Sequence, residues 1–155
     1  MPKTSAALLL YRHGTDGLEV LIAHMGGPFW ARKDAGAWSI PKGEYTDEEP
    51  LAAARREFAE EMGSPPPDGE PVALGTVKQS GGKSVTTFAV EGDFDLAGFR
   101  SNTFELEWLR GSGRTQEFPE VDRAAWVPVA VAREKLVKGQ VPVVDALVEH
   151  LGSDA

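Results

Sequence analysis

Apolar residues along this chain fall into short strand-like runs and a few longer stripes with the period of a helix. Together these predict a mixed sheet covered by helices, an α/β (α+β) fold. The runs rich in Val, Leu and Ile and bounded by Gly, Pro or polar residues are the expected strands. They are Ser5–Arg12, Leu18–Met25, Ala37–Ile40, Val72–Gln79, Ser84–Glu91, Thr103–Leu109 and Ala125–Val129. Glycine-containing turns at residues 13–17 and 80–83 predict that two successive pairs of these strands form β-hairpins.

The longest helical stripe is expected to run from about Glu49 to Met62. Pro50 suits its first turn, where a missing N–H costs little, and Gly63 suits its C-terminal end. Its apolar stripe consists of Leu51, Ala54, Phe58 and Met62. Two further helices are expected at Ala130–Lys138 and Val143–Leu151.

Three glutamates, Glu57, Glu60 and Glu61, occupy neighbouring positions on one face of the predicted helix. On a helical wheel they centre roughly 110° from the apolar stripe, beside the core-facing side. Like charges at this spacing destabilise a bare helix by roughly 0.2–0.5 kcal/mol per pair. A hard cation such as Mg²⁺ or Mn²⁺ would reverse that effect, since it prefers carboxylate oxygens.

Composition narrows the class of protein. With 155 residues, 41% of them hydrophobic and 26% charged, the chain is expected to form a single soluble domain over residues 1–155. The net charge of −8 argues against nucleic acid or anionic membrane as a partner. The chain has no cysteine, which excludes disulfides and thiolate metal sites. No apolar run has the length of a membrane span, so we expect a cytoplasmic protein.

Around the three glutamates, the residues resemble the sequence box of the Nudix hydrolases. That box runs Gly, five residues, Glu, seven residues, then Arg-Glu-apolar-x-Glu-Glu-x-Gly. Here it is matched by Pro41-Lys42-Gly43 and by Arg56-Glu57-Phe58-Ala59-Glu60-Glu61-Met62-Gly63. The stretch between Gly43 and Arg56 is one residue shorter than in the box. Glu48 and Glu49 therefore both stay candidates for the residue that Arg56 orients.

The resemblance implies an α/β/α sandwich and a divalent-metal-dependent pyrophosphohydrolase. The substrate class would be a nucleoside diphosphate linked to another group, attacked by water at phosphorus. Glu57, Glu60, Glu61 and the carbonyl group of Gly43 would hold Mg²⁺ or Mn²⁺. Glu57 would also be a candidate general base. Which nucleotide is cleaved, and how many metal ions take part, stay open, with a slight preference for dinucleoside polyphosphates from the Pro-Lys-Gly sequence.

Further site residues follow from the same resemblance. Glu120, six residues before Trp126, is the preferred additional metal ligand or base. The alternatives are Glu117 and, if their strand faces the site, Glu105 or Glu107. The expected catalytic residues are thus Glu57, Glu120 and Arg56.

Two residues near the box are candidate substrate ligands. Lys42 can meet a substrate phosphate, and Tyr45 can stack on a base, as can Phe29, Trp30 and Phe118. We interpret Gly81-Gly82-Lys83 as a hairpin turn and not as a phosphate-binding loop, because it lacks the spaced glycines and the following helix. The expected partner is a small-molecule nucleotide bound by a monomer or homodimer. The alternative is a catalytically silent nucleotide-binding or regulatory module with the same fold, which commonly lacks some of the box glutamates.

Overall fold

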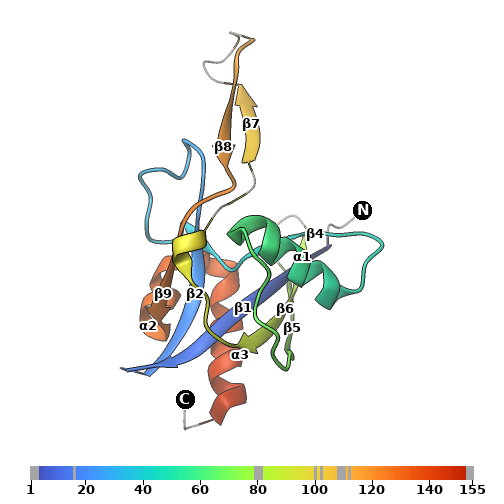
Figure 1. Ribbon diagram of the computed structural model, residues 1–155, viewed down its shortest axis with the longest axis vertical. Coiled ribbons are helices and arrows are strands. Elements are labelled where there is room, and N and C mark those ends of the chain that lie inside the picture. Colours follow the sequence, from blue (N-terminus) through green and yellow to red (C-terminus); the bar gives the residue numbers. More distant parts are fainter. Residues whose placement is uncertain are drawn as a thin grey trace.

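The computed structural model describes residues 4–15, 17–78, 82–99, 101, 103–107, 111 and 113–152 (Figure 1). Its strands are β1 (Thr4–Gly14), β2 (Gly17–Met25), β3 (Trp38–Ser39), β4 (Lys42–Glu44), β5 (Val72–Lys78), β6 (Ser84–Glu91), β7 (Thr103–Glu107), β8 (Thr115–Pro119) and β9 (Val121–Pro128). Its helices are α1 (Pro50–Met62), α2 (Val129–Lys135) and α3 (Val141–Leu151), with short 3₁₀ helices at Leu96–Gly98 and Lys138–Gln140.

The main sheet is mixed and has seven strands in the described residues. Its central order is β3-β2-β1-β6-β5, with β4 added to β1 and β9 added to β2. All pairs are antiparallel except β1 with β6, which is parallel. β1 and β2 pair only beside their turn, from Tyr11↔Val20 to Gly14↔Gly17. Beyond that point β1 pairs with β4 and β2 pairs with β3, so the segment that leads into α1 lies between the two diverging strands.

The core has two layers, one on each side of the sheet, and β1 contributes to both. Ala6, Leu8 and Leu10 pack in the cluster that contains the buried residues of α1, whereas Ala7, Leu9 and Tyr11 pack in the cluster that contains α2 and α3. A strand covered on both faces reads as a continuous apolar run, which explains its sequence. The predicted arrangement of a mixed sheet flanked by helices is therefore confirmed.

Most predicted elements of this sheet are present. Both expected hairpins form, as β1–β2 and β5–β6. α1 ends at Gly63, whose φ of +87° is the left-handed conformation that glycine adopts freely. The predicted apolar stripe of α1 needs one correction: Leu51 is only half-buried, whereas Ala53 is buried. Ala53 is covered because α1 also packs against β4, on the side of the helix that carries the glutamates.

The region from residue 103 to residue 128 departs most from expectation. The predicted strand at 103–109 is present as β7, but it pairs with an unpredicted strand, β8, in a separate two-stranded sheet that extends away from the body (Figure 1). Residues 108–110 lie outside the described part of the chain. β9 starts at Val121, four residues before the predicted strand. β8 lacks the apolar alternation that a sequence pattern detects, since Thr115, Gln116 and Glu117 are exposed. Within the described residues, no helix is long and apolar enough to cross a membrane.

Candidate active site

Arg56 lies at the centre of the polar side of α1 and binds three glutamates. Its Nε donates to both carboxylate oxygens of Glu48, at 3.0 and 2.9 Å, and its Nη2 donates to Glu48 Oε1 at 2.7 Å. Its Nη1 donates to Glu57 Oε1 at 2.9 Å and to Glu60 Oε2 at 3.0 Å. Two guanidinium nitrogens on one carboxylate form the geometrically specific kind of ion pair, and this pairing holds the pKa of Glu48 below its usual range.

The choice between Glu48 and Glu49 as the partner of Arg56 is thereby decided in favour of Glu48. Glu49 is the N-cap residue of α1, but its exposed side chain makes no capping hydrogen bond. Its contribution is made by the backbone, where its carbonyl oxygen accepts a hydrogen bond from the N–H of Ala53 at 2.9 Å.

β4 brings its backbone against the glutamates of α1. A Cβ atom added to Gly43 would overlap the carboxyl group of Glu57, so a larger residue here would displace that carboxyl group. Next to it, the backbone N–H of Lys42 donates to Glu61 Oε1 at 3.3 Å. The predicted neighbourhood of Gly43 and Glu57 is therefore present, and it depends on the pairing of β4 with β1.

The carboxylates of this region are close enough to raise one another's pKa. Burial raises the pKa of Glu61 to about 8, and the charges of Glu120 and Glu57 add to that effect. Burial also raises the pKa of Glu57, although the hydrogen bond from Arg56 acts in the opposite direction. The pKa of Glu120 is raised by loss of surrounding water and then by the charge of Glu60. Glu120 is thus brought to the glutamates of α1 from about 60 residues farther along the chain.

Glu120 stands at the bend between β8 and β9, and the bend is tied to the end of β2. Its carbonyl oxygen accepts a hydrogen bond from Gly26 N–H at 2.9 Å. The buried ring of His24 lies 2.7 Å by its Nδ1 from Asp122 Oδ1 and 2.6 Å by its Nε2 from the carbonyl oxygen of Lys33. These contacts connect the bend, β2 and the loop at residues 26–36, and so fix the backbone that carries Glu120.

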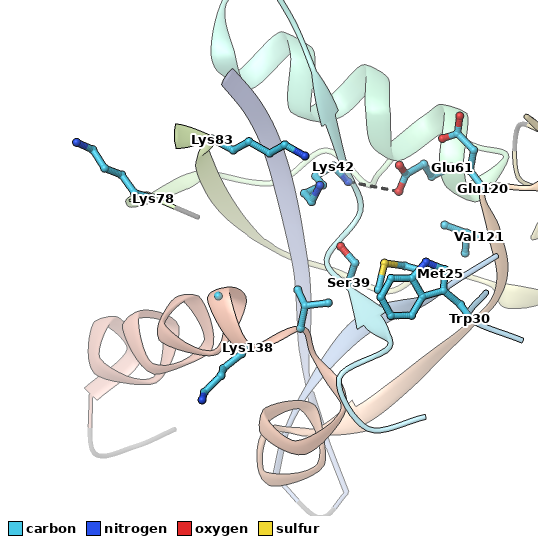
Figure 2. A pocket seen from close by; sticks show the side chains of 12 residues that line it. Met25, Trp30, Ser39, Lys42, Glu61, Lys78, Lys83, Glu120, Val121 and Lys138 are labelled. Atoms are coloured by element: carbon cyan, nitrogen blue, oxygen red, sulfur yellow. Dashed lines mark hydrogen bonds between the residues drawn. The ribbon is translucent and has the colours of Figure 1, made fainter. Parts of the chain in front are cut away.

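A cavity of about 770 Å³ opens beside these carboxylates (Figure 2). Its lining combines acidic, basic and apolar side chains from many elements. The lining residues are Met25, Trp30, Ser39, Lys42, Glu61, Lys78, Lys83, Glu120, Val121, Val137, Lys138 and Gly139. A cavity of this size, with convergent charged groups and raised carboxylate pKa values, has the properties of a small-molecule site.

Comparison with known proteins agrees with this geometry. The NUDIX domain family matches residues 1–147. The chain belongs to the Nudix family. This match confirms the sequence-based assignment to the Nudix hydrolases, enzymes that act on phosphorus-containing acid anhydrides. A search of curated proteins found no match.

Solved structures confirm the Nudix fold at low sequence identity. The NUDIX domain of Shewanella oneidensis NrtR, solved with ADP ribose, is 17% identical with a TM-score of 0.64, over 97% of this chain and 89% of that one. A Caenorhabditis elegans Ap4A hydrolase is 17% identical with a TM-score of 0.63, over 95% and 97% of the two chains. The MutT protein of Methanosarcina mazei is 18% identical with a TM-score of 0.62, over 98% and 97%.

The cavity gathers only some of the residues singled out from the sequence. Lys42, Glu61 and Glu120 line it, and Trp30 does so among the aromatic candidates. Glu57, Glu60 and Arg56 do not line it, but they lie on α1 within five residues of Glu61. Tyr45 is half-buried and packs against the core cluster on the α1 side, so the structure does not bring it to the cavity.

The other candidates do not line the cavity either. Phe29 is exposed on the loop before β3, and Phe118 lies on β8. Among the alternative acids, Glu105 and Glu117 face each other across β7 and β8 in the two-stranded sheet. The side chain of Glu107 is outside the described set.

The charged cavity residues that the sequence analysis does not single out are Lys78, Lys83 and Lys138. Lys83 was assigned to a hairpin turn, and it does lie between β5 and β6, but its side chain also lines the cavity. Lys83 comes near β4 because β6 pairs in parallel with β1, with Ser84 opposite Thr4. The next residue of β1, Ser5, pairs with β4. That pairing cannot be read from the local sequence.

Nudix enzymes generally use divalent metals, and the donors here suit such an ion. They are hard oxygens, namely four glutamate carboxylates and the backbone of Gly43, and the glycine keeps space that a Cβ would fill. These carboxylates raise one another's pKa values because their negative charges repel. A bound cation would offset that repulsion. Among the described residues, no three His, Asp or Glu side chains are already gathered closely enough to hold a metal ion. Arg56 instead binds Glu57 and Glu60.

Proposed function

We propose that this chain is a divalent-metal-dependent pyrophosphohydrolase that cleaves a nucleoside diphosphate linked to another group. The observation that carries the proposal is the cavity at which Glu61 of α1, Glu120 before β9 and Lys42 of β4 meet. Three distant segments contribute opposite charges to one space. This is the arrangement needed to bind a phosphate chain and a cation together.

In this proposal Glu57, Glu60, Glu61 and Glu120, with the carbonyl group of Gly43, hold Mg²⁺ or Mn²⁺. The metal, when bound, lowers the pKa of water and neutralises phosphate charge. Arg56 is a positioning residue, because it touches Glu48, Glu57 and Glu60 and does not line the cavity. Arg56 binds one oxygen of each carboxylate, Glu57 Oε1 and Glu60 Oε2, so the second oxygen of each would hold the cation.

Two carboxylates are candidates for the base that takes a proton from the attacking water. Glu120 lines the cavity directly. The side chain of Glu57 is only 13% exposed and is bound to Arg56. Both have raised pKa values, which bring a carboxylate closer to the range in which it accepts a proton effectively. Lys42 is proposed to bind a substrate phosphate as a point charge.

The apolar part of the cavity is the proposed binding site of the nucleoside. Met25, Trp30 and Val121 line the cavity together with Glu120, and Figure 2 shows Met25, Trp30 and Val121 on the same side of the view as Glu120. An aromatic face accepts any base by stacking, with little selectivity. We therefore propose Trp30, and not Tyr45, as the aromatic residue that contacts the base.

The test is phosphate release from a panel of nucleotides, measured with Mg²⁺, with Mn²⁺ and with chelator. Wild type should turn over at least one substrate with metal and none with chelator. Glu60→Gln should lower turnover by roughly 100-fold, because even outer partners of a metal site contribute roughly 10–100-fold. Glu134→Gln is the matched control, since Glu134 is an exposed glutamate on α2 that does not line the cavity.

Two results would contradict the proposal. Turnover that survives both chelator and Glu60→Gln would exclude the metal assignment. Absence of turnover with every substrate and metal would favour the alternative of a catalytically silent nucleotide-binding or regulatory module. Other expectations stay predictions: a single domain over residues 1–155, a cytoplasmic location, a monomer or homodimer, and no nucleic acid or membrane as partner.

A further inference from the structure

The histidine near the end of β2, His24, joins two segments that are far apart in the sequence. Its side chain is fully buried, and a buried polar ring destabilises the fold unless it is hydrogen-bonded. Its Nδ1 lies 2.7 Å from Asp122 Oδ1, and its Nε2 lies 2.6 Å from the carbonyl oxygen of Lys33. Both distances are those of hydrogen bonds. One ring therefore links the start of β9 to the loop at residues 26–36.

The partner on β9, Asp122, lies at an irregularity of the main sheet. β2 and β9 pair in antiparallel fashion, with His24 opposite Arg123 but Met25 opposite Val121. Asp122 is therefore the extra residue of a β-bulge. Such a bulge leaves its extra residue without a partner in the ladder and turns side chains away from their regular directions, commonly beside functional sites. The hydrogen bond to His24 holds the residue at which β9 departs from regular pairing.

The bulge adjoins Glu120, which comes two residues before Asp122. On its other side, the carbonyl oxygen of Glu120 accepts from Gly26 N–H at 2.9 Å. A Cβ atom added to Gly26 would overlap the carbonyl oxygen of Pro119, so the two backbones are in close contact. Glu120 is thus held between the contact with Gly26 and the bond from Asp122 to His24. A metal ligand must be held within about 0.5 Å of its working position, which requires support of this kind.

The same histidine also supports Trp30, which lines the cavity. Lys33 N–H donates to the carbonyl oxygen of Trp30 at 2.9 Å, and Trp30 N–H donates to the carbonyl oxygen of Gly27 at 3.2 Å. The carbonyl group of Lys33 then binds His24. The turn that carries Trp30 is therefore fastened to β2 through the histidine ring. In the described part of the chain, neither His24 nor Asp122 lines the cavity.

We propose that His24 is a positioning residue for both halves of the cavity. Through Asp122 it places Glu120 for the metal ion. Through the carbonyl group of Lys33 it places Trp30 for the nucleoside. This inference rests on the proposed function, which assigns the metal ion to the glutamates and the base to Trp30. Two separable effects follow: loss of Asp122 affects the metal site, whereas loss of His24 affects both halves.

The first test is binding of Mn²⁺, measured by electron paramagnetic resonance. His24→Leu removes both hydrogen bonds, and Asp122→Ala removes one and keeps the buried ring. Each should bind Mn²⁺ about tenfold more weakly than wild type, as is common for outer partners of a metal site. Asp122→Asn keeps a group that can hydrogen-bond to the ring and should restore the affinity to within about twofold of wild type. The control is Asp145→Ala, which breaks a surface ion pair on α3 and should have no effect.

The same measurement in a Glu120→Gln background separates positioning from a general loss of structure. If Asp122 acts by placing Glu120, then Asp122→Ala should weaken Mn²⁺ binding no further once Glu120 is replaced. An equal loss in both backgrounds would overturn the inference, because the pair would then act on the fold as a whole. Unchanged Mn²⁺ binding in His24→Leu and Asp122→Ala would overturn it as well.

The second test is binding of ADP in chelator, measured by calorimetry. His24→Leu should weaken binding at least about fivefold, as loss of stacking on a base does, and should add no further loss in Trp30→Ala. Asp122→Ala should stay within about twofold of wild type, since it keeps the contact with Lys33. If His24→Leu does not fold, His24→Gln takes its place, because one amide nitrogen replaces the two ring nitrogens.

The outcomes distinguish this inference from the proposed function. ADP binding that is absent in wild type, or that is as tight in the His24 variant as in wild type, would overturn the inference. If Mn²⁺ and ADP affinities change as expected but no nucleotide is hydrolysed, the positioning role stands and the hydrolase function fails. If wild type hydrolyses a nucleotide with Mg²⁺ and the His24 variant has the same kcat and KM, the hydrolase function stands and the positioning role fails.

Discussion

Helices α1 and α3 are built alike but carry different chemistry. Each has a proline in its first turn and ends at a glycine with positive φ, +87° at Gly63 and +73° at Gly152. Each buries one apolar face on its side of the sheet, with Phe58 at the centre of one cluster and Leu147 in the other.

The difference lies in what covers the second face of each helix. On α3, Asp145 and Glu149 are exposed, and Asp145 pairs with Arg133 at 2.9 Å. On α1, the polar face is held by Arg56 and covered by β4, which partly removes Glu57 and Glu61 from water. The features that α1 and α3 share therefore do not identify the candidate active site. The site arises where a neighbouring strand covers acidic residues.

The largest effects should come from the feature that the two helices share, their buried face. Phe58→Ala on α1 should lower the free energy of unfolding by about 3–5 kcal/mol, and Leu147→Ala on α3 by about 2–5 kcal/mol, since both side chains are fully buried. Urea denaturation of the two variants measures this. A cost below 1 kcal/mol at either position would show that its helix does not anchor the fold.

The next largest effect, on catalytic turnover, should differ between the two helices. Glu61→Gln on α1 should lower turnover of a nucleotide substrate by roughly 100-fold, whereas Glu149→Gln on α3 should leave it within twofold. Glutamine keeps the oxygen that accepts from Lys42 N–H, so the fold should persist in both variants. Steady-state rates with Mg²⁺ measure the effect, and equal rates for the two variants would remove the functional distinction between the helices.

The pH dependence of stability sharpens the same distinction. The folded protein raises the pKa of Glu61 from 4.5 to about 8 and so binds its proton more tightly than the unfolded chain does. The free energy of unfolding of the metal-free protein should therefore fall as the pH rises from about 4.5 to about 8. Urea denaturation in chelator should show this fall reduced in Glu61→Gln and unchanged in Glu149→Gln. A constant difference between wild type and Glu61→Gln over that range would contradict the assignment.

The smallest effects belong to the helix ends. Gly63→Ala should lower the free energy of unfolding by about 1 kcal/mol, because alanine tolerates the left-handed conformation poorly, and Gly152→Ala by at least as much, because its φ of +73° with ψ of −166° is adopted almost only by glycine. A cost at least as large for Gly152→Ala would confirm that both helices end at a backbone conformation that favours glycine. A variant as stable as wild type would show that its helix end rearranges without cost.

The sequence predicted what depends on local spacing. α1, its end at Gly63 and the shared face of Glu57, Glu60 and Glu61 follow from helical geometry, and both hairpins follow from their turns. Glu120 is a candidate only through the family resemblance, which its spacing to Trp126 matches, and the structure does bring it to the cavity. What could not be predicted depends on which strands become neighbours.

Lys78, Lys83 and Lys138 illustrate this limit. They reach the cavity only because β6 joins β1 in parallel and because Gln140 fastens the α2–α3 connection to β3. Glu48 was separable from Glu49 only by the path of the chain before α1, which turns Glu48 toward Arg56. Tyr45 shows the converse: it is close in sequence to Lys42, but it packs against the core cluster on the α1 side and does not line the cavity.

Binding of Mn²⁺, followed by electron paramagnetic resonance, tests the central claim most directly. The claim is that the covered acidic face of α1, together with Glu120, is a metal site. Wild type and Glu149→Gln should bind Mn²⁺ alike, and Glu61→Gln and Glu120→Gln should each bind it at least about tenfold more weakly. Mn²⁺ binding that is the same in all four proteins would contradict the account.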